Sequence, residues 1–172
     1  PTGAGNTVAS FTASLNDLER EARTTADHLA RSDHLIADLH LLSEYQDPAN
    51  YRAILYDEEK KHLARRLRQV VLTTSATEVY AYLADGTLAA FTRRDGDALA
   101  TGIQSYRNGQ PLLRLFQGEG QRWQAAALDV LPADSRTQEV AAPTTATYRA
   151  GDARVVQEVR RAVDLDPGRP AT

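Results

Sequence analysis

The sequence predicts an α+β domain in which a long helix leads into an antiparallel sheet, and two observations predict it. Near the start of the chain, apolar residues recur in alternating steps of three and four, a spacing that keeps one seam along a helical rod. The residues of this seam are Val8, Phe11, Leu15, Leu18, Ala22, Leu29, Ile36 and Leu39, with Thr25 and Ser32 at the intervening positions. After residue 78 the apolar pattern alternates instead, and Gly and Asp residues separate short runs. We therefore expect one helix from Thr7 to about Tyr45, followed by strands.

A second helix is predicted over residues 48–73. Asp47 can cap its first turn, and Pro48 suits the first helical position because the N–H that proline lacks would have no partner there. Its apolar positions are Tyr51, Ile54, Leu55, Leu63, Leu67, Val70 and Val71. Because Leu63 and Leu67 are four residues apart, we expect their face to be buried. The charged run at 57–61 separates the two halves of this pattern.

The first strands are predicted as a hairpin. Residues 79–83 alternate as a strand, and Asp85-Gly86 is the dipeptide that supplies two positive-φ positions to a two-residue turn. The chain then returns as a strand over 88–91. A second turn is expected at 94–97, after which residues 98–106 are interpreted as helical or irregular and 107–111 as a loop.

Later strands are predicted over 112–116, 122–131 and 140–142. The run 154–165 is ambiguous, because Val155, Val159 and Val163 are four apart and also fit a helix. We favour a strand, since the run is rich in Val and follows a turn at 150–152. The whole is expected to be one domain over residues 7–166, with a sheet region at 79–166 and tails at 1–6 and 167–172.

Composition narrows the classes of function. The chain has 172 residues, enough for one domain with a core, and 42% of them are hydrophobic. A net charge of −3 gives no basic excess for a phosphate backbone, so we expect no nucleic-acid partner. No cysteine is present, which excludes disulfides and thiol chemistry. No apolar stretch reaches the roughly 18 residues that span a bilayer. Because the chain begins at Pro1 and contains no Met, we expect it to be a piece of a longer protein.

The titratable residues do not predict an enzyme, a metal site or a cofactor. His28, His34 and His40 are six residues apart on the first helix, so they point in different directions. His34 and Asp38 are one turn apart but lack a third metal ligand. Turn chemistry explains the carboxylates that lie beside glycines, which are Asp85, Asp95 and Asp97. Neither a glycine-rich phosphate loop nor a nucleophile motif occurs.

Four residues are candidates for binding a small molecule. Tyr82 and Trp123 lie on predicted strands, and Tyr106 and Arg107 lie next to the loop at 107–111. Aromatic walls with one arginine suit a small anion, because the guanidinium offers a planar pair of donors to a carboxylate. The alternative is that the aromatic residues simply belong to the core or to a sheet face.

The pattern of elements resembles the Cache (PAS-like) extracytoplasmic sensor domains of bacterial transmembrane signalling proteins. The resemblance covers residues 7–166 and lies in the long first helix, the second helix, the hairpin Val79-Tyr80-Ala81-Tyr82-Leu83-Ala84-Asp85-Gly86-Thr87-Leu88 and the ending over 140–166. It implies a PAS-like antiparallel sheet of about five strands with the long helix packed behind it. It also implies a ligand pocket on the other sheet face, covered by about residues 97–116, which include Tyr106 and Arg107.

The resemblance further implies a function. The chain is expected to be the periplasmic ligand-sensing part of a membrane-anchored histidine kinase, diguanylate cyclase or chemoreceptor. Tyr82, Tyr106, Arg107 and Trp123 would line the pocket for a small ligand such as a carboxylate, and the first helix would pair with its twin in a homodimer. Two alternatives stay open: a ligand-free module for dimerisation or partner recognition, and a soluble cytoplasmic protein that begins with a helical hairpin.

Overall fold

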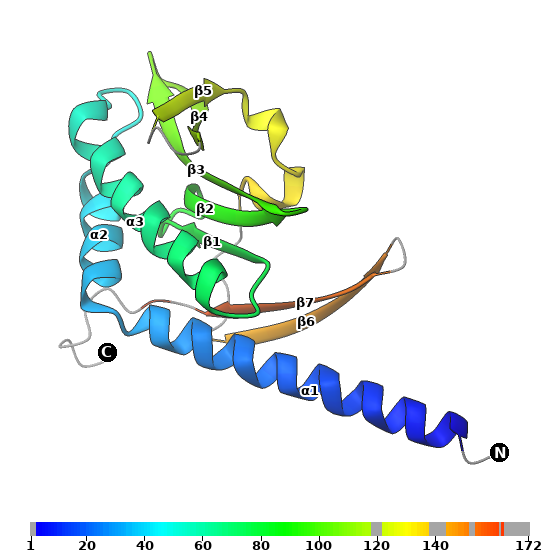
Figure 1. Ribbon diagram of the computed structural model, residues 1–172. Coiled ribbons are helices and arrows are strands. Elements are labelled where there is room, and N and C mark those ends of the chain that lie inside the picture. The colour runs from blue at the N-terminus through cyan, green and yellow to red at the C-terminus, as the bar shows by residue number, and fades with distance from the viewer. Residues whose placement is uncertain (1–2, 118–121, 138–143, 152–153, 162, 164–172) are drawn as a thin grey trace.

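The computed structural model describes residues 3–117, 122–137, 144–151, 154–161 and 163, and the statements below concern these residues (Figure 1). The helices are α1 (Gly3–Ala30), α2 (Asp33–Tyr45) and α3 (Ala53–Thr73). The strands are β1 (Glu78–Tyr82), β2 (Leu88–Asp95), β3 (Ala98–Arg107), β4 (Gln110–Gln117), β5 (Arg122–Ala126), β6 (Thr144–Gly151) and β7 (Arg154–Arg161). Two short 3-10 helices, η1 (Leu128–Val130) and η2 (Ala133–Ser135), follow β5.

Five strands form one antiparallel sheet in which spatial order equals sequence order, β1-β2-β3-β4-β5. Helix α3 lies across one face of this sheet and contacts β1, β2 and β3. The predicted α+β class, with helices packed on a five-stranded antiparallel sheet, is therefore confirmed. Strands β6 and β7 form a separate two-stranded ribbon, and α1 runs alongside β7 (Figure 1).

The expected single helix over 7–45 is two helices. Arg31 and Ser32 interrupt it, and Ser32 has an extended backbone with φ −72° and ψ 115°. The physical reason is that the two parts have different surroundings. Helix α1 buries no residue over Gly3–Ala30, whereas α2 buries three leucines against the body of the domain, which are Leu35, Leu39 and Leu42. The chain bends so that α2 can pack while α1 extends outward (Figure 1).

The second helix begins later than predicted, at Ala53 instead of Pro48, and ends at Thr73 as predicted. Asp47 caps a turn instead of the helix: its carboxylate accepts hydrogen bonds from the Ala49 N–H at 2.9 Å and from Asn50 Nδ2 at 2.7 Å. Residues 47–50 therefore form a local turn that leads into α3.

The largest correction concerns residues 98–106, which were expected to be helical or irregular and form the central strand β3. Residues 101–105 are buried on both faces of the sheet, so their side chains do not alternate between apolar and polar. A two-residue turn at Gly96-Asp97, with φ 60° at Gly96, connects β2 directly to β3. Residues 97–116 therefore do not cover a pocket, because they are strands of the sheet itself.

The turn with two positive-φ residues also lies at a different place from the one predicted. Asp85-Gly86 does not supply two positive-φ residues, since only Gly86 has positive φ, at 83°. The two-residue turn with both central residues at positive φ is instead Asn108-Gly109, at 52° and 74°, between β3 and β4. This turn replaces the loop that was expected over 107–111.

The sheet has a core on each face. The helix-side core joins α2 and α3 to the sheet, and its buried residues are Leu35, Leu39, Leu42, Tyr56, Leu63, Ala64, Leu67, Ala81, Leu83, Ala89, Ala90 and Ile103. On the other face, Leu88, Phe91 and Leu113 pack against Leu131. The strand expected over 122–131 ends at Ala126, and the chain then folds back through η1 and η2 so that Leu131 covers this second core.

The C-terminal hairpin is confirmed where the structure describes it. Residues 154–161 are a strand, as predicted, and pair antiparallel with 144–151. The strand expected over 140–142 lies outside the described residues. None of the described helices combines the length and the apolar character that a membrane crossing requires.

Candidate functional site

Tyr82 and Trp123, two of the predicted binding residues, lie on opposite sides of the sheet. Tyr82 packs against the second core and donates a 2.9 Å hydrogen bond to the Ser135 carbonyl oxygen. Trp123 packs against the helix-side core, edge-on to Phe116 with ring centroids 5.4 Å apart, and Lys61 Nζ lies 5.8 Å from its ring centroid. The expectation that these two residues line one pocket is therefore wrong.

Tyr106 and Arg107 end the central strand β3, but their side chains have different surroundings. Tyr106 is half-buried, its ring lies 5.2 Å from that of Tyr51, and its hydroxyl accepts a 2.9 Å hydrogen bond from Gln104 Nε2. Arg107 is exposed at the start of the turn to β4. The structure thus does not gather the four predicted residues, and it joins Tyr106 to a buried polar cluster that the sequence analysis missed. Ligand binding by any of the four stays a prediction.

This buried polar cluster, which we call the Lys60 cluster, connects α3 to the middle of the sheet. Its members are Tyr51, Asp57, Lys60, Gln104, Ser105, Tyr106 and Arg114. They come from the loop before α3, from α3 itself, and from β3 and β4. The cluster therefore joins α3 to the loop before it and to two strands of the sheet.

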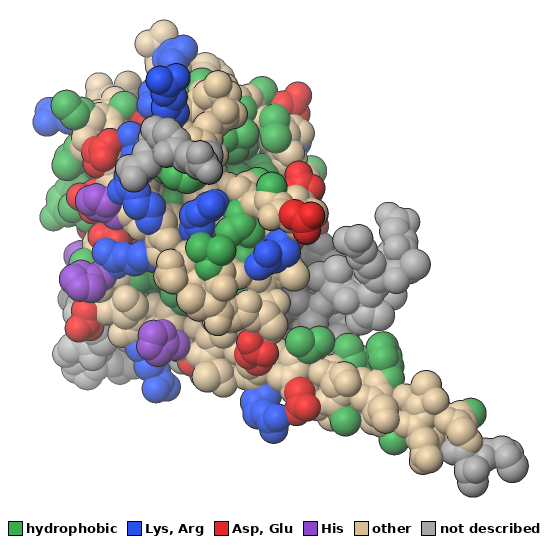
Figure 2. All heavy atoms as spheres, viewed as in Figure 1, with side chains coloured by type: hydrophobic (Ala, Val, Ile, Leu, Met, Phe, Trp, Pro, Cys, Tyr) green, Lys and Arg blue, Asp and Glu red, His purple; other side chains and the backbone are tan. Residues whose placement is uncertain are grey.

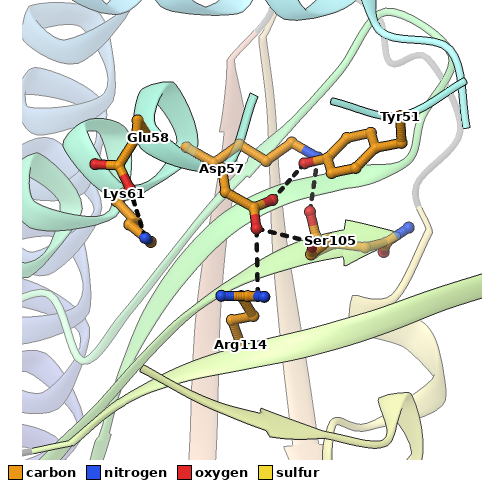
Figure 3. A network of polar contacts seen from close by, with 8 residues as sticks. Tyr51, Asp57, Glu58, Lys61, Ser105 and Arg114 are labelled. Atoms are coloured by element: carbon orange, nitrogen blue, oxygen red, sulfur yellow. Dashed lines mark hydrogen bonds and ion pairs between the residues drawn. The ribbon is translucent and has the colours of Figure 1, made fainter. Parts of the chain in front are cut away.

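Asp57 is the acceptor on which the cluster converges. Its carboxylate is buried and accepts hydrogen bonds from the Tyr51 hydroxyl at 2.6 Å and from Ser105 Oγ at 3.0 Å. Arg114 Nε lies 3.2 Å from Asp57 Oδ2, in an ion pair whose angles are not those of a hydrogen bond. Figure 3 shows the three side chains pointing toward Asp57, while the ion pair Glu58–Lys61 lies apart. One carboxylate thus ties α3 to its preceding loop and to two strands.

Lys60 is the second charged centre of the cluster. Its side chain is fully buried, and Nζ donates a 2.6 Å hydrogen bond to the backbone carbonyl oxygen of Gln104. The same nitrogen lies 5.0 Å from the ring centroid of Tyr51 and 5.5 Å from that of Tyr106, within the range of cation–π attraction. Burial lowers the pKa of Lys60 to about 7, and the carboxylates of Asp57 and Asp85 oppose this shift only in part.

The tyrosines beside Lys60 stay protonated. Burial, with the nearby Asp57 carboxylate, raises the pKa of Tyr51. Burial likewise raises the pKa of Tyr106. Both phenols are therefore neutral donors at ordinary pH, so Lys60 is the member of the cluster whose charge changes near neutral pH.

The sequence analysis missed this cluster because charged runs usually lie on a solvated face. The signal that could have found it is helical phase. The buried face of α3 consists of Tyr56, Asp57, Lys60, Leu63, Ala64, Leu67 and Val71, which recur in steps of three and four. Asp57 and Lys60 are in phase with Leu63 and Leu67, whereas Glu58 and Lys61 are not.

Helices α2 and α3 share another polar contact. Arg66 Nη1 lies 3.6 Å from Asp38 Oδ2, and both atoms are buried without a hydrogen-bond partner. Burial raises the pKa of Asp38, while Arg66 and His62 act in the opposite direction. Among the residues with described positions, no group of three or more His, Asp or Glu side chains is arranged to hold a metal ion.

Helix α1 presents a surface of a different kind. Its apolar seam faces solvent at the far end, where Val8 is 65% exposed and Phe11 is 55% exposed. Leu18, further along the seam, is 46% exposed. Figure 2 shows the rod projecting from the body with hydrophobic side chains along it.

Comparisons of the chain with protein-family models, with curated proteins and with solved structures found no match.

Proposed function

We propose that this chain is the periplasmic sensor domain of a membrane-bound signal transducer of the histidine kinase, diguanylate cyclase or chemoreceptor type. The observation that carries the proposal is that α1 extends from the body and that three residues of its apolar seam, Val8, Phe11 and Leu18, are exposed. A helix that projects in this way is suited to passing a packing change along its axis. The Cache-like (PAS-like) sensor class is part of the proposal, supported by helices packed on a five-stranded antiparallel sheet.

The proposed partner of α1 is the same helix of a second copy. An isolated helix is marginally stable in water, and most of its stability in proteins comes from packing an apolar face. Full burial of a side chain such as Val8, Phe11 or Leu18 is worth about 1.5–3 kcal/mol. Pairing the two seams would bury these residues on both copies, and a shift of one helix against the other would carry the signal.

The proposed input is a small molecule such as a carboxylate. Arg107 is exposed at the β3–β4 turn, so its guanidinium can offer its pair of donors to an anion there. Tyr106 precedes it on the strand, and since successive side chains of a strand point to opposite faces, its ring would support such a site only indirectly. Tyr82 and Trp123 lie elsewhere and would act there only indirectly.

A ligand-free module for dimerisation or partner recognition is the second candidate. The observation that favours it is the packing of the sheet face opposite α3. The segment from η1 to η2 covers that face, Leu131 is only 3% exposed there, and the Tyr82 hydroxyl is bonded to Ser135. In this candidate α1 pairs as above but no small molecule binds.

Sedimentation equilibrium tests the part that both candidates share. The wild-type chain is expected to dimerise, and Phe11→Glu is expected to weaken the dimer because it places a charge in the seam. Ile54→Glu is the matched control, since Ile54 is an even more exposed apolar residue, at 89%, on α3. A wild-type chain that stays monomeric up to high micromolar concentration, or equal weakening by both variants, would refute pairing through α1.

A further inference from the structure

The use of lysine in this chain is unusual. The sequence contains 18 arginines and two lysines, Lys60 and Lys61, which are adjacent. Lys61 is partly exposed and pairs with Glu58 at 2.6 Å, whereas Lys60 is fully buried. Arginine stays protonated in proteins, but a buried lysine can release its proton. The buried face of α3 therefore holds, in Lys60, one of the few cationic side chains of this chain that can become neutral.

The charges around Lys60 leave its ammonium form poorly compensated. The carboxylate of Asp57 is already engaged by Arg114, at 3.2 Å, and by the hydroxyls of Tyr51 and Ser105. The hydrogen bond of Lys60 goes instead to the neutral carbonyl oxygen of Gln104. An ammonium has three donors, and burial with a single hydrogen bond to a neutral acceptor favours the neutral amine.

The titratable and charged groups that face Lys60 come from every surrounding element. Asp57 lies on α3, Tyr51 in the preceding loop, Tyr106 on β3 and Arg114 on β4, and Asp85 in the β1–β2 turn adds a more distant negative charge. The two carboxylates favour the ammonium. Burial, the largest influence, favours the amine. The two phenols stay protonated, so neither exchanges a proton with Lys60 near neutral pH.

We propose that Lys60 is a proton-binding switch in the contact between α3 and β3, and that uptake of a proton from solvent at Nζ loosens the 51–57 segment from the sheet. The segment responds because it is held by the same groups that surround Nζ. Tyr51 stacks near Lys60 and bonds Asp57, and Asp57 bonds Ser105 of β3. An ammonium at Nζ is stabilised by contact with water or with a carboxylate. Either contact requires Tyr51 or Asp57 to move, because these residues pack around the buried nitrogen. This inference goes beyond the proposed function and depends on neither a membrane nor a dimer.

The first test observes the proton directly. With lysine labelled at ¹³Cε, the full chain gives two lysine signals, and Lys61→Arg removes one and so assigns the other to Lys60. The Lys60 signal is expected to titrate with a midpoint near pH 7, because burial lowers its pKa to about that value. If the Lys60 signal shows no titration between pH 6 and 8, the switch does not exist.

The second test observes the loosening. Hydrogen exchange of the amides of the 51–57 segment, where the N–H groups of Leu55 and Tyr56 bond to the Arg52 carbonyl oxygen, is expected to show several-fold less protection at pH 6 than at pH 8 after correction for the intrinsic rate at each pH. In Lys60→Met, which keeps a long unbranched side chain without the charge, protection is expected to be the same at both pH values. Equal pH dependence in wild type and Lys60→Met would overturn the proposal. If Lys60→Met does not fold, the wild-type titration and exchange still decide it, since a wild type without any pH-dependent protection also overturns it.

Discussion

The phenol of Tyr51 donates a 2.6 Å hydrogen bond to Oδ1 of Asp57, six residues later in the chain. This bond joins the loop before α3 to the helix. It adds to the contacts that the buried carboxylate makes with Ser105 and Arg114. Because the acceptor is charged and buried, the bond is stronger than one between neutral groups.

Tyr51→Phe removes this donor and leaves the Asp57 carboxylate short of a partner. We expect the free energy of unfolding to fall by about 1.5–3 kcal/mol, the usual range for hydrogen bonds to charged groups. Urea denaturation measures it, and Tyr45→Phe is the control because Tyr45 is exposed and should change stability by less than about 0.5 kcal/mol. Equal stability of Tyr51→Phe and wild type would show that the bond does not matter.

Lys60→Met should change how stability depends on pH. The pKa of Lys60 is 10.5 ordinarily and about 7 in the folded chain, so between these values the unfolded chain binds a proton that the folded chain does not. The contribution of Lys60 to the free energy of unfolding therefore rises as the pH increases above 7 and falls as the pH returns to 7. Below pH 7 this contribution stays constant, because Lys60 is protonated in both states. Each pH unit is worth about 1.4 kcal/mol.

Between pH 7 and 9, the wild type should thus gain about 2 kcal/mol relative to Lys60→Met. Urea denaturation at several pH values measures the difference, and Lys61→Met, on the adjacent partly exposed residue, should keep the wild-type slope. Parallel pH profiles for wild type and Lys60→Met would contradict a buried lysine with a lowered pKa.

Gly102→Ala tests the packing of the second core against β3. A Cβ at this position would lie 2.6 Å from Cε1 of Phe91 and 2.9 Å from Cδ2 of Leu115, closer than packed carbon atoms come. We expect a loss of about 1–3 kcal/mol in unfolding free energy from overpacking. Gly5→Ala on α1, where a Cβ meets nothing within 4 Å, should leave stability unchanged or slightly raised. A neutral Gly102→Ala would mean that Phe91 is packed differently.

Arg107→Ala tests the proposed anion anchor. In a thermal-shift screen of small carboxylates, any compound that raises the melting temperature of the wild type should have a reduced effect on Arg107→Ala. Arg122→Ala, which removes another exposed arginine at the start of β5, should respond like the wild type. If the wild type responds and Arg107→Ala responds equally, Arg107 is not the anchor; if no carboxylate acts on the wild type, the ligand-free candidate is favoured.

The elements with a clear period could be predicted from the sequence. The seam from Val8 to Leu29 predicted α1, alternation predicted β1, and a short apolar run predicted β4. The break at Ser32 could not be predicted, because nothing in the local pattern shows that the body of the domain draws α2 away from the direction of α1. Strand β3 was missed because its buried stretch includes Thr101, Gln104 and Ser105, whose polar groups find partners only in the folded chain.

The candidate site was less accessible to sequence reasoning than the fold. Aromatic residues on predicted strands suggested a binding site, yet Tyr82 and Trp123 lie on opposite faces of the sheet. Asp57 and Lys60 of the Lys60 cluster lie within a charged run, and only their phase relative to Leu63 distinguishes them from Glu58 and Lys61. A pair of residues from a helix and a strand, such as Asp57 and Ser105, 48 positions apart, becomes visible only with the tertiary structure.

Disulfide formation between single cysteines on α1 tests the central claim, the pairing of α1 with its twin, most directly. The chain has no cysteine, so Leu18→Cys in the seam and Asp17→Cys beside it each introduce one thiol. Paired parallel helices bring identical seam positions together and hold positions off the seam apart. We expect mild oxidation to give a covalent dimer of Leu18→Cys and little of Asp17→Cys. Absence of the Leu18→Cys dimer, or equal dimer from both variants, would contradict the account.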